Sequence, residues 1–73
     1  MSDPRRFKVT ITTVHGRNLD YTVFTPVDAR RAVALTAQVH QERVPEDPLR
    51  EFIRLESLPG AAADAGDIID TSE

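Results

Sequence analysis

The sequence contains no cysteine and no tryptophan, and only three of its 73 residues are glycine. Without cysteine, the chain can form neither disulfide bonds nor a metal site made of thiolates. Its two histidines lie far apart in the sequence, so a zinc site would also need carboxylates. No run of about 18 apolar residues is present, which argues against a membrane-spanning helix.

The scarcity of glycine also removes many catalytic motifs that depend on tight loops. Gly16 lies between two strand-like segments, whereas Gly60 and Gly66 lie near the C-terminus. The sequence has no phosphate-binding loop, paired-glycine dinucleotide fingerprint, nucleophile elbow or helical zinc-protease motif. We therefore expect a protein that is not an enzyme and that needs no cofactor or metal.

The length of the chain limits how much stability one core can supply. A domain of 73 residues buries only about 60 % of its surface, which gives a few kcal/mol of stability. Because disulfides and thiolate metal sites are excluded, association with a second copy is the remaining source of stability. We therefore expect a homodimer. No apolar signal core follows the N-terminus, so we expect a cytoplasmic protein.

Two segments with alternating polarity, residues 7–14 and 19–25, predict a β-hairpin. Both are rich in the β-branched residues that favour half-buried strands. Alternate positions of the two segments form one apolar face. The members of this face are Phe7, Val9, Ile11, Leu19, Tyr21 and Val23.

The residues between these segments predict the register of the hairpin. Pairing His15 with Leu19 aligns the two apolar faces, whereas a shift of one residue would place apolar side chains opposite polar ones. This register needs a three-residue loop, residues 16–18. Because asparagine tolerates the left-handed conformation at the end of such a loop, we predict a bulge near Asn18.

A helix start is indicated directly after the second strand. Thr25 can act as the N-cap, Pro26 suits the first helical position, and Asp28 stands where the acid of a capping box is expected. We predict a helix from Pro26 to Arg43, because Pro45 follows closely and cannot continue it.

Residues 49–58 allow two interpretations. Local spacing of Leu49, Phe52 and Ile53 is compatible with a second helix, which would give a ββαα domain. As a strand, the segment would turn Ile53 and Leu55 inward and Phe52 outward. Because a lone two-stranded hairpin is marginal, a third strand would complete a sheet under the helix. We therefore predict an α+β domain of ββαβ type over residues 1–58.

The last 15 residues differ in composition from the rest. Residues 1–57 carry nine basic and eight acidic residues, whereas residues 58–73 carry four acidic residues and no basic one. Residues 59–73 also contain no aromatic side chain, so we predict a disordered acidic tail. Within it, Ile68 and Ile69 stand between two aspartates and could contact a partner.

The surface of the predicted sheet offers a candidate partner-binding site. An open sheet edge invites an added strand, either from a partner protein or from a second copy. The sheet face away from the helix is rich in threonine and exposes one phenylalanine. The candidate partner-binding residues are Thr10, Thr12, Thr22, Phe24, Ile68 and Ile69.

An arginine patch provides the alternative interpretation, a small nucleic-acid-binding regulator. The net charge of −3 and the few aromatic residues disfavour it. The candidate residues are Arg5, Arg6, Arg17, Arg30 and Arg31. We expect His15 to be an exposed turn residue. We expect His40 to be partly buried at the edge of the apolar face of the helix. Because the charge and composition disfavour nucleic-acid binding, our main hypothesis is a protein-interaction module, such as an accessory or regulatory protein of the phage or plasmid type.

Overall fold

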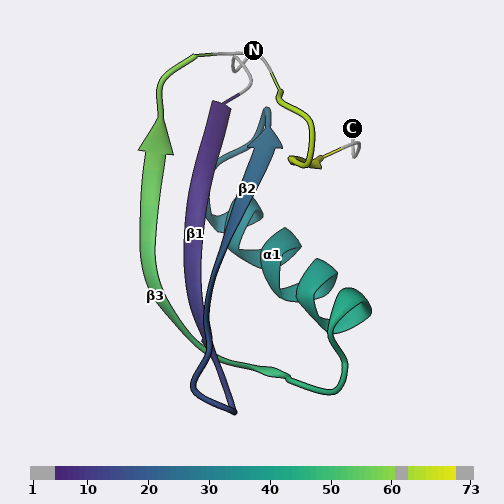
Figure 1. The fold of residues 1–73 in the computed structure, drawn as a ribbon. Coiled ribbons are helices and arrows are strands. Elements are labelled where there is room, and N and C mark those ends of the chain that lie inside the picture. Colours follow the sequence, from purple (N-terminus) through teal and green to yellow (C-terminus); the bar gives the residue numbers. More distant parts are fainter. Residues whose placement is uncertain (1–4, 61–62, 71–73) are drawn as a thin grey trace.

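The computed structural model describes residues 5–60 and 63–70 as a four-stranded sheet with one helix (Figure 1). The elements are β1 (Arg5–Thr13), β2 (Asn18–Thr25), α1 (Ala29–Arg43), β3 (Leu49–Leu58) and β4 (Ile68–Ile69). The strand order across the sheet is β3-β1-β2-β4. No helix in the described part of the chain is long and apolar enough to cross a membrane.

β1 lies between its two neighbours and is antiparallel to both. The chain therefore crosses from β2 through α1 to β3 on the far side of β1, and β4 adds a short parallel pair to β2. The predicted ββαβ arrangement is confirmed, and residues 49–58 form a strand rather than a second helix. In Figure 1 the helix lies on the β1–β2 side of the sheet, whereas β3 forms the opposite flank.

Two irregularities in β3 alter the expected direction of its side chains. The pairing of β1 with β3 shifts between Thr10 and Ile11 and again between Thr12 and Thr13. The first shift leaves Ile53 as the extra residue of a bulge, so Phe52 comes to lie opposite Ile11. Because opposite residues share a face, Phe52 stands on the helix side of the sheet, and the prediction that it points outward is wrong.

The hairpin keeps the predicted faces but not the predicted register. Ile11 pairs with Leu19, so the register is shifted from the predicted one by an even number of positions and the apolar faces still coincide. The backbone N–H of Thr13 donates to the carbonyl of Arg17 at 2.8 Å, which closes a loop of residues 14–16. Gly16 takes the left-handed conformation with φ of 81°, and no described residue other than glycine has positive φ. The loop has the predicted length of three residues, but its left-handed residue is Gly16 and not Asn18.

The helix begins three residues later than predicted. Asp28 is the N-cap, and its carboxylate accepts a hydrogen bond from the backbone N–H of Arg31 at 3.0 Å. The hydroxyl of Thr25 instead accepts from the backbone N–H of Val27 and donates to Asp70. The predicted helix end at Arg43 is confirmed.

The core lies between the helix and the β1–β2 side of the sheet. Its buried apolar side chains are Phe7, Val9, Ile11, Val23, Ala32 and Ile68. The contribution of Ile68 was not expected, because residues 59–73 were predicted to form a disordered tail. Ile68 is only 6 % exposed and pairs with Val23, so that prediction is wrong for residues 67–70. The predictions for residues 61–62 and 71–73 lie outside the described residues.

Asp28 gives a direct test of the helix start. Replacing it with alanine (Asp28→Ala) removes the acceptor for the N–H of Arg31 and should lower the free energy of unfolding by about 1 kcal/mol. Chemical denaturation measures this change. Glu46→Ala, which removes a carboxylate from an exposed loop, serves as the control and should change stability by less than about 0.5 kcal/mol. Equal effects of both substitutions would contradict the assignment of the cap.

Candidate interaction surface

The largest group of exposed apolar side chains lies on β3. Phe52, Ile53 and Leu55 are 41 %, 55 % and 39 % exposed, although the strand pairs with β1 along its length. Leu55 lies opposite Val9, which is completely buried, and therefore stands on the helix side of the sheet. The helix covers Val9 but leaves Leu55 uncovered. β3 thus presents an apolar side and, in the described part of the chain, an outer edge without a partner strand.

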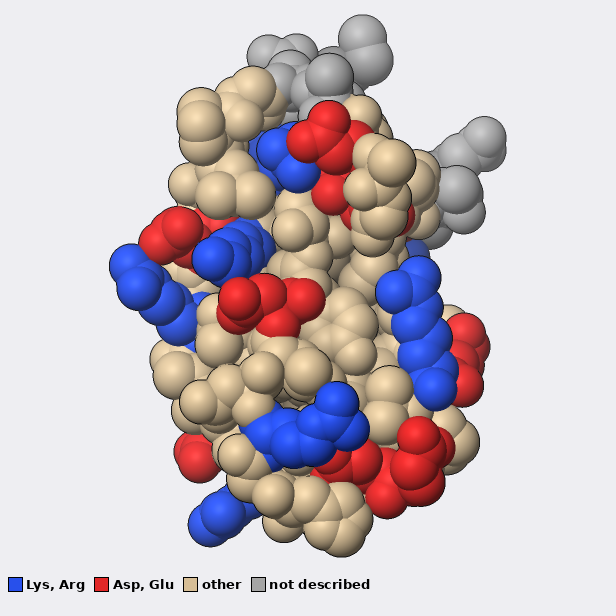
Figure 2. Space-filling view, viewed as in Figure 1, with Lys and Arg blue, Asp and Glu red and all other residues tan. Residues whose placement is uncertain are grey.

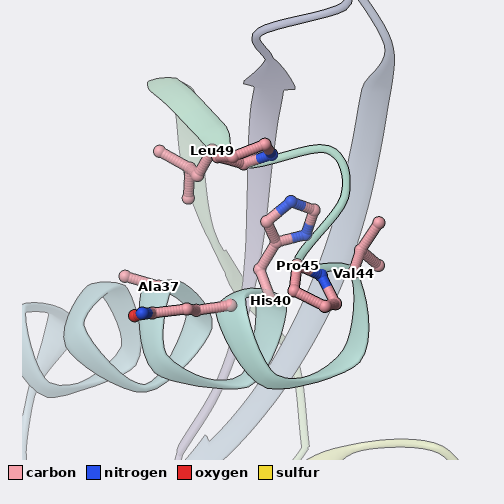
Figure 3. A pocket seen from close by; sticks show the side chains of 7 residues that line it. Ala37, His40, Val44, Pro45 and Leu49 are labelled. Atoms are coloured by element: carbon pink, nitrogen blue, oxygen red, sulfur yellow. The ribbon is translucent and has the colours of Figure 1, made fainter.

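A pocket of about 400 Å³ adjoins the start of this strand (Figure 3). The last turns of α1, the two prolines of the loop that follows and Leu49 form its walls. Most of the side chains in Figure 3 are apolar, and His40 contributes its ring to the wall. The pocket and the uncovered side of β3 together form the candidate interaction surface.

His40 is held by hydrogen bonds on both ring nitrogens and is fully buried. Its Nε2 lies 2.7 Å from the carbonyl oxygen of Asp47, which can only accept, so Nε2 carries the hydrogen. With the hydrogen on Nε2, Nδ1 accepts from the hydroxyl of Tyr21 at 2.6 Å. Since both nitrogens are occupied, His40 links α1 to β2 and to the α1–β3 loop. The expectation of a partly buried His40 underestimated its burial.

Tyr21 is well suited to donate this hydrogen bond. Burial raises the pKa of its phenol above the usual value, while the nearby charges of Arg43 and Arg17 oppose the shift. The phenol therefore keeps its proton at neutral pH. The rings of Tyr21 and His40 also meet edge to face, with centroids 5.7 Å apart.

Asp47 is a buried residue that sequence reasoning did not single out. Its side chain is 4 % exposed, and its Oδ1 accepts a hydrogen bond from the backbone N–H of His15 at 3.2 Å. Oδ2 makes no hydrogen bond with a described residue, but Nη1 of Arg17 lies 3.7 Å away. The backbone N–H of Val14 also donates to the carbonyl of Pro48. Asp47 and Pro48 thus fasten the hairpin tip to the loop before β3.

The threonines proposed as a docking face form a polar ladder instead. The hydroxyl of Thr10 donates to Asp20 at 2.7 Å, and that of Thr12 donates to Asn18 at 2.8 Å. Thr22 and Phe24 are half-buried on the same face. These contacts link β1 to β2.

The two isoleucines of the C-terminal segment have opposite surroundings. Ile68 lies in the core, so it is not available to a partner as predicted, whereas Ile69 is 47 % exposed beside Phe24. Asp67 and Asp70 on either side of them each form an ion pair, with Arg6 and Arg31 respectively. This segment, residues 67–70, is called the acidic strap below.

The five arginines proposed for nucleic-acid contact do not form one free patch. Arg6 and Arg31 bind carboxylates of the acidic strap, and Arg17 lies beside Asp47 at the hairpin tip. Arg5 and Arg30 are exposed. Figure 2 shows basic and acidic side chains interspersed on the face it presents. This distribution does not favour binding to a phosphate backbone.

Neither a metal cluster nor a known relative indicates a function. Among residues 5–60 and 63–70, no group of three histidine, aspartate or glutamate side chains could hold a metal ion. No protein-family model, curated protein or solved structure matches this chain.

The bond between Tyr21 and His40 can be tested by Tyr21→Phe. The substitution keeps the aromatic ring but leaves Nδ1 of His40 buried without a donor, so the free energy of unfolding should fall by about 1–3 kcal/mol. Thr12→Val removes an exposed hydrogen bond of β1 and serves as the control. Denaturant titration of both variants measures the difference.

The pH dependence tests whether the folded chain buries the phenol of Tyr21 in its protonated form. Because the folded state raises the pKa of Tyr21, its contribution is present below about pH 10 and is lost as the pH rises further. The stability difference between the parent chain and Tyr21→Phe should therefore shrink above about pH 10. A difference that stays constant up to pH 11 or so would contradict this role of the phenol.

Proposed function

We propose that this chain is a small non-catalytic protein-interaction module, of the accessory or regulatory kind, that self-associates through the outer edge of β3. The observation that supports this function is the uncovered apolar side of an edge strand. Phe52 and Leu55 stand on the helix side of β3, yet they remain 41 % and 39 % exposed. An added strand would pair the free backbone groups of the open edge and place these side chains against apolar side chains of the second copy.

The second half of β3 is the better part of the strand for such pairing. Residues 54–58 pair with β1 without interruption, whereas both register shifts fall between residues 49 and 54. Bulges twist an edge and hinder the addition of another strand. The contact is therefore centred on residues 54–58.

The charges on this half select a second copy in one register. Arg54 and Glu56 lie on the face away from the helix and form an ion pair at 2.8 Å. A two-fold axis through Leu55 places Arg54 of each copy opposite Glu56 of the other. Axes through Arg54 or through Glu56 would instead place like charges opposite each other, which is unfavourable. The strand is thus complementary to itself about Leu55.

The same axis also joins the apolar sides of the two copies. Residues that lie opposite each other in an antiparallel pair share a face, so Leu55 of one copy contacts Leu55 of the other on the helix side. Phe52 extends this contact at both ends. The exposed ion pairs add little affinity, because such pairs give about 0–1 kcal/mol, but they fix the register. A weak dimer with a small interface is expected.

Charge reversal tests the register. Arg54→Glu or Glu56→Arg alone places like charges opposite each other twice, and each should raise the dissociation constant of the dimer about tenfold. The double variant, Arg54→Glu with Glu56→Arg, restores opposite charges and should return the constant to that of the parent chain. Sedimentation velocity over a range of protein concentrations measures all four proteins.

Two results would overturn different parts of this proposal. Equal dissociation constants for all four proteins would exclude the register centred on Leu55. A parent chain that stays monomeric at about millimolar concentration would exclude self-association itself. Denaturation of the single variants should show nearly unchanged monomer stability, because the ion pair is exposed.

Disulfide trapping gives an independent test, because the chain has no cysteine of its own. Leu55→Cys places one thiol per copy on the two-fold axis, where opposite Cβ atoms of paired strands lie about 5 Å apart. Mild oxidation should therefore yield a covalent dimer, visible on a non-reducing gel. Val14→Cys, at the hairpin tip and 50 % exposed in the parent chain, is the matched control and should remain mainly monomeric. Equal yields would contradict pairing through β3.

A further inference from the structure

The opposite edge of the sheet, formed by β2, holds the acidic strap by contacts of unusual specificity. Asp67 accepts hydrogen bonds from Nε and Nη2 of Arg6 at 2.9 and 3.3 Å. Asp70 accepts from Nε and Nη2 of Arg31 at 3.1 and 3.3 Å. Forked arginine–carboxylate pairs of this kind give geometric selectivity as well as energy.

The two arginines hold the acidic strap from opposite sides of the sheet. Arg6 belongs to β1 and lies on the face away from the helix, whereas Arg31 belongs to the first turn of α1. Between them, Ile68 enters the core beside Val23, and the N–H of Asp70 donates to the carbonyl of Phe24 at 2.9 Å. The site therefore recognises backbone, charge and side-chain size at once.

Arg31 is poorly placed for the helix alone. Positive charge in the first turn opposes the helix macrodipole, and no acidic residue in that turn compensates it. Asp70 supplies the compensating carboxylate, and its Oδ2 also accepts from the hydroxyl of Thr25 at 2.6 Å. Beyond the N-cap carboxylate of Asp28, the position of Arg31 is thus explained by its pairing with Asp70.

We propose that the edge of β2, with Arg6 and Arg31, is a binding slot for an extended acidic segment of a partner protein, which residues 67–70 occupy in the isolated chain. The geometry defines the ligand as aspartate, aliphatic residue, a less restricted residue and aspartate in succession. The third position is less restricted than the second, because Ile69 is 47 % exposed whereas Ile68 is 6 % exposed. This proposal concerns the sheet edge opposite β3 and does not depend on self-association.

The covalent link between β3 and the acidic strap, called the tether here, explains why the strap occupies the slot in the isolated chain. A short linker gives its own segment an effective concentration of about millimolar, so a free segment must exceed this value to replace it. The hydrogen bond from Arg6 lowers the pKa of Asp67 most, and the N–H of Asp64 lowers it further, against the effect of burial. Asp67 therefore stays charged at neutral pH and keeps its ion pair with Arg6.

Cutting the tether in the folded chain tests the slot directly. A protease recognition sequence inserted after Gly60, which is exposed, allows the intact protein to be folded first and then cleaved. A fluorescent synthetic peptide with the sequence of residues 63–73 is then added, and its uptake is measured by anisotropy. We expect it to exchange with the cleaved segment and to bind more weakly as the salt concentration rises.

Matched controls separate recognition from non-specific attraction. A peptide in which Asp67 and Ile68 exchange places keeps composition and charge, and it should bind at least about tenfold more weakly because neither side chain meets its site. In the cleaved protein, Arg31→Gln should weaken binding by a similar factor. Arg30→Gln, an exposed neighbour on the same helix, should leave it unchanged.

Three results would overturn the proposal. The first is a cleaved protein that keeps its fold but takes up no labelled peptide. The second is equal binding of the native and exchanged peptides. The third is unfolding of the body when its own segment dissociates, monitored by circular dichroism, since the strap would then be an integral strand rather than a ligand. Exchange with the expected order of affinities supports the slot.

Discussion

The core is built on β1, because this strand is paired along both edges and carries three completely buried side chains. Val9, Ile11 and Thr13 are fully buried on its helix side. A hairpin of β1 and β2 alone would be marginal in water, so the pairing of β3 with β1 is required for a stable sheet. The conformation of residues 49–58 is therefore set by the open edge of β1 and not by their own local preference, which favours a helix slightly.

The sequence predicted which side chains share a face of the sheet better than it predicted which residues pair across neighbouring strands. Alternation in β1 and β2 determines which side chains share a face, and this was confirmed for the apolar set. Any register shifted by an even number of residues keeps the same faces, so alternation alone cannot choose among them. The choice is made at the hairpin tip, where His15 is bound to Asp47, 32 residues further along the chain. The bulge at Ile53 likewise depends on how β3 meets β1.

Long-range ion pairs explain the remaining errors at the helix start and in the C-terminal segment. The N-cap was predicted at Thr25, but the hydroxyl of Thr25 is engaged by Asp70, 45 residues away, and Asp28 caps the helix. The acidic composition of residues 59–73 indicated disorder, yet Arg6 and Arg31 neutralise two of its aspartates. In the same way, Asp47 was overlooked because only the folded chain brings it beside Arg17. The composition of a segment therefore does not by itself predict whether the segment folds, because contacts with distant residues of the same chain can order it.

The dimensions of helices and strands explain why the two sheet edges differ. A helix with its side chains is about 10 Å across, and strands lie about 4.8 Å apart, so one helix covers roughly two strands. α1 lies over the β1–β2 side, where the strap closes the neighbouring edge with two arginine–aspartate pairs. Nothing of comparable size remains in the described part of the chain to cover β3. Its bulges hinder added strands near Ile53, but residues 54–58 have no such protection. A domain of one helix and four strands thus leaves apolar surface on one flank, and the proposed pairing of two copies about Leu55 would cover it.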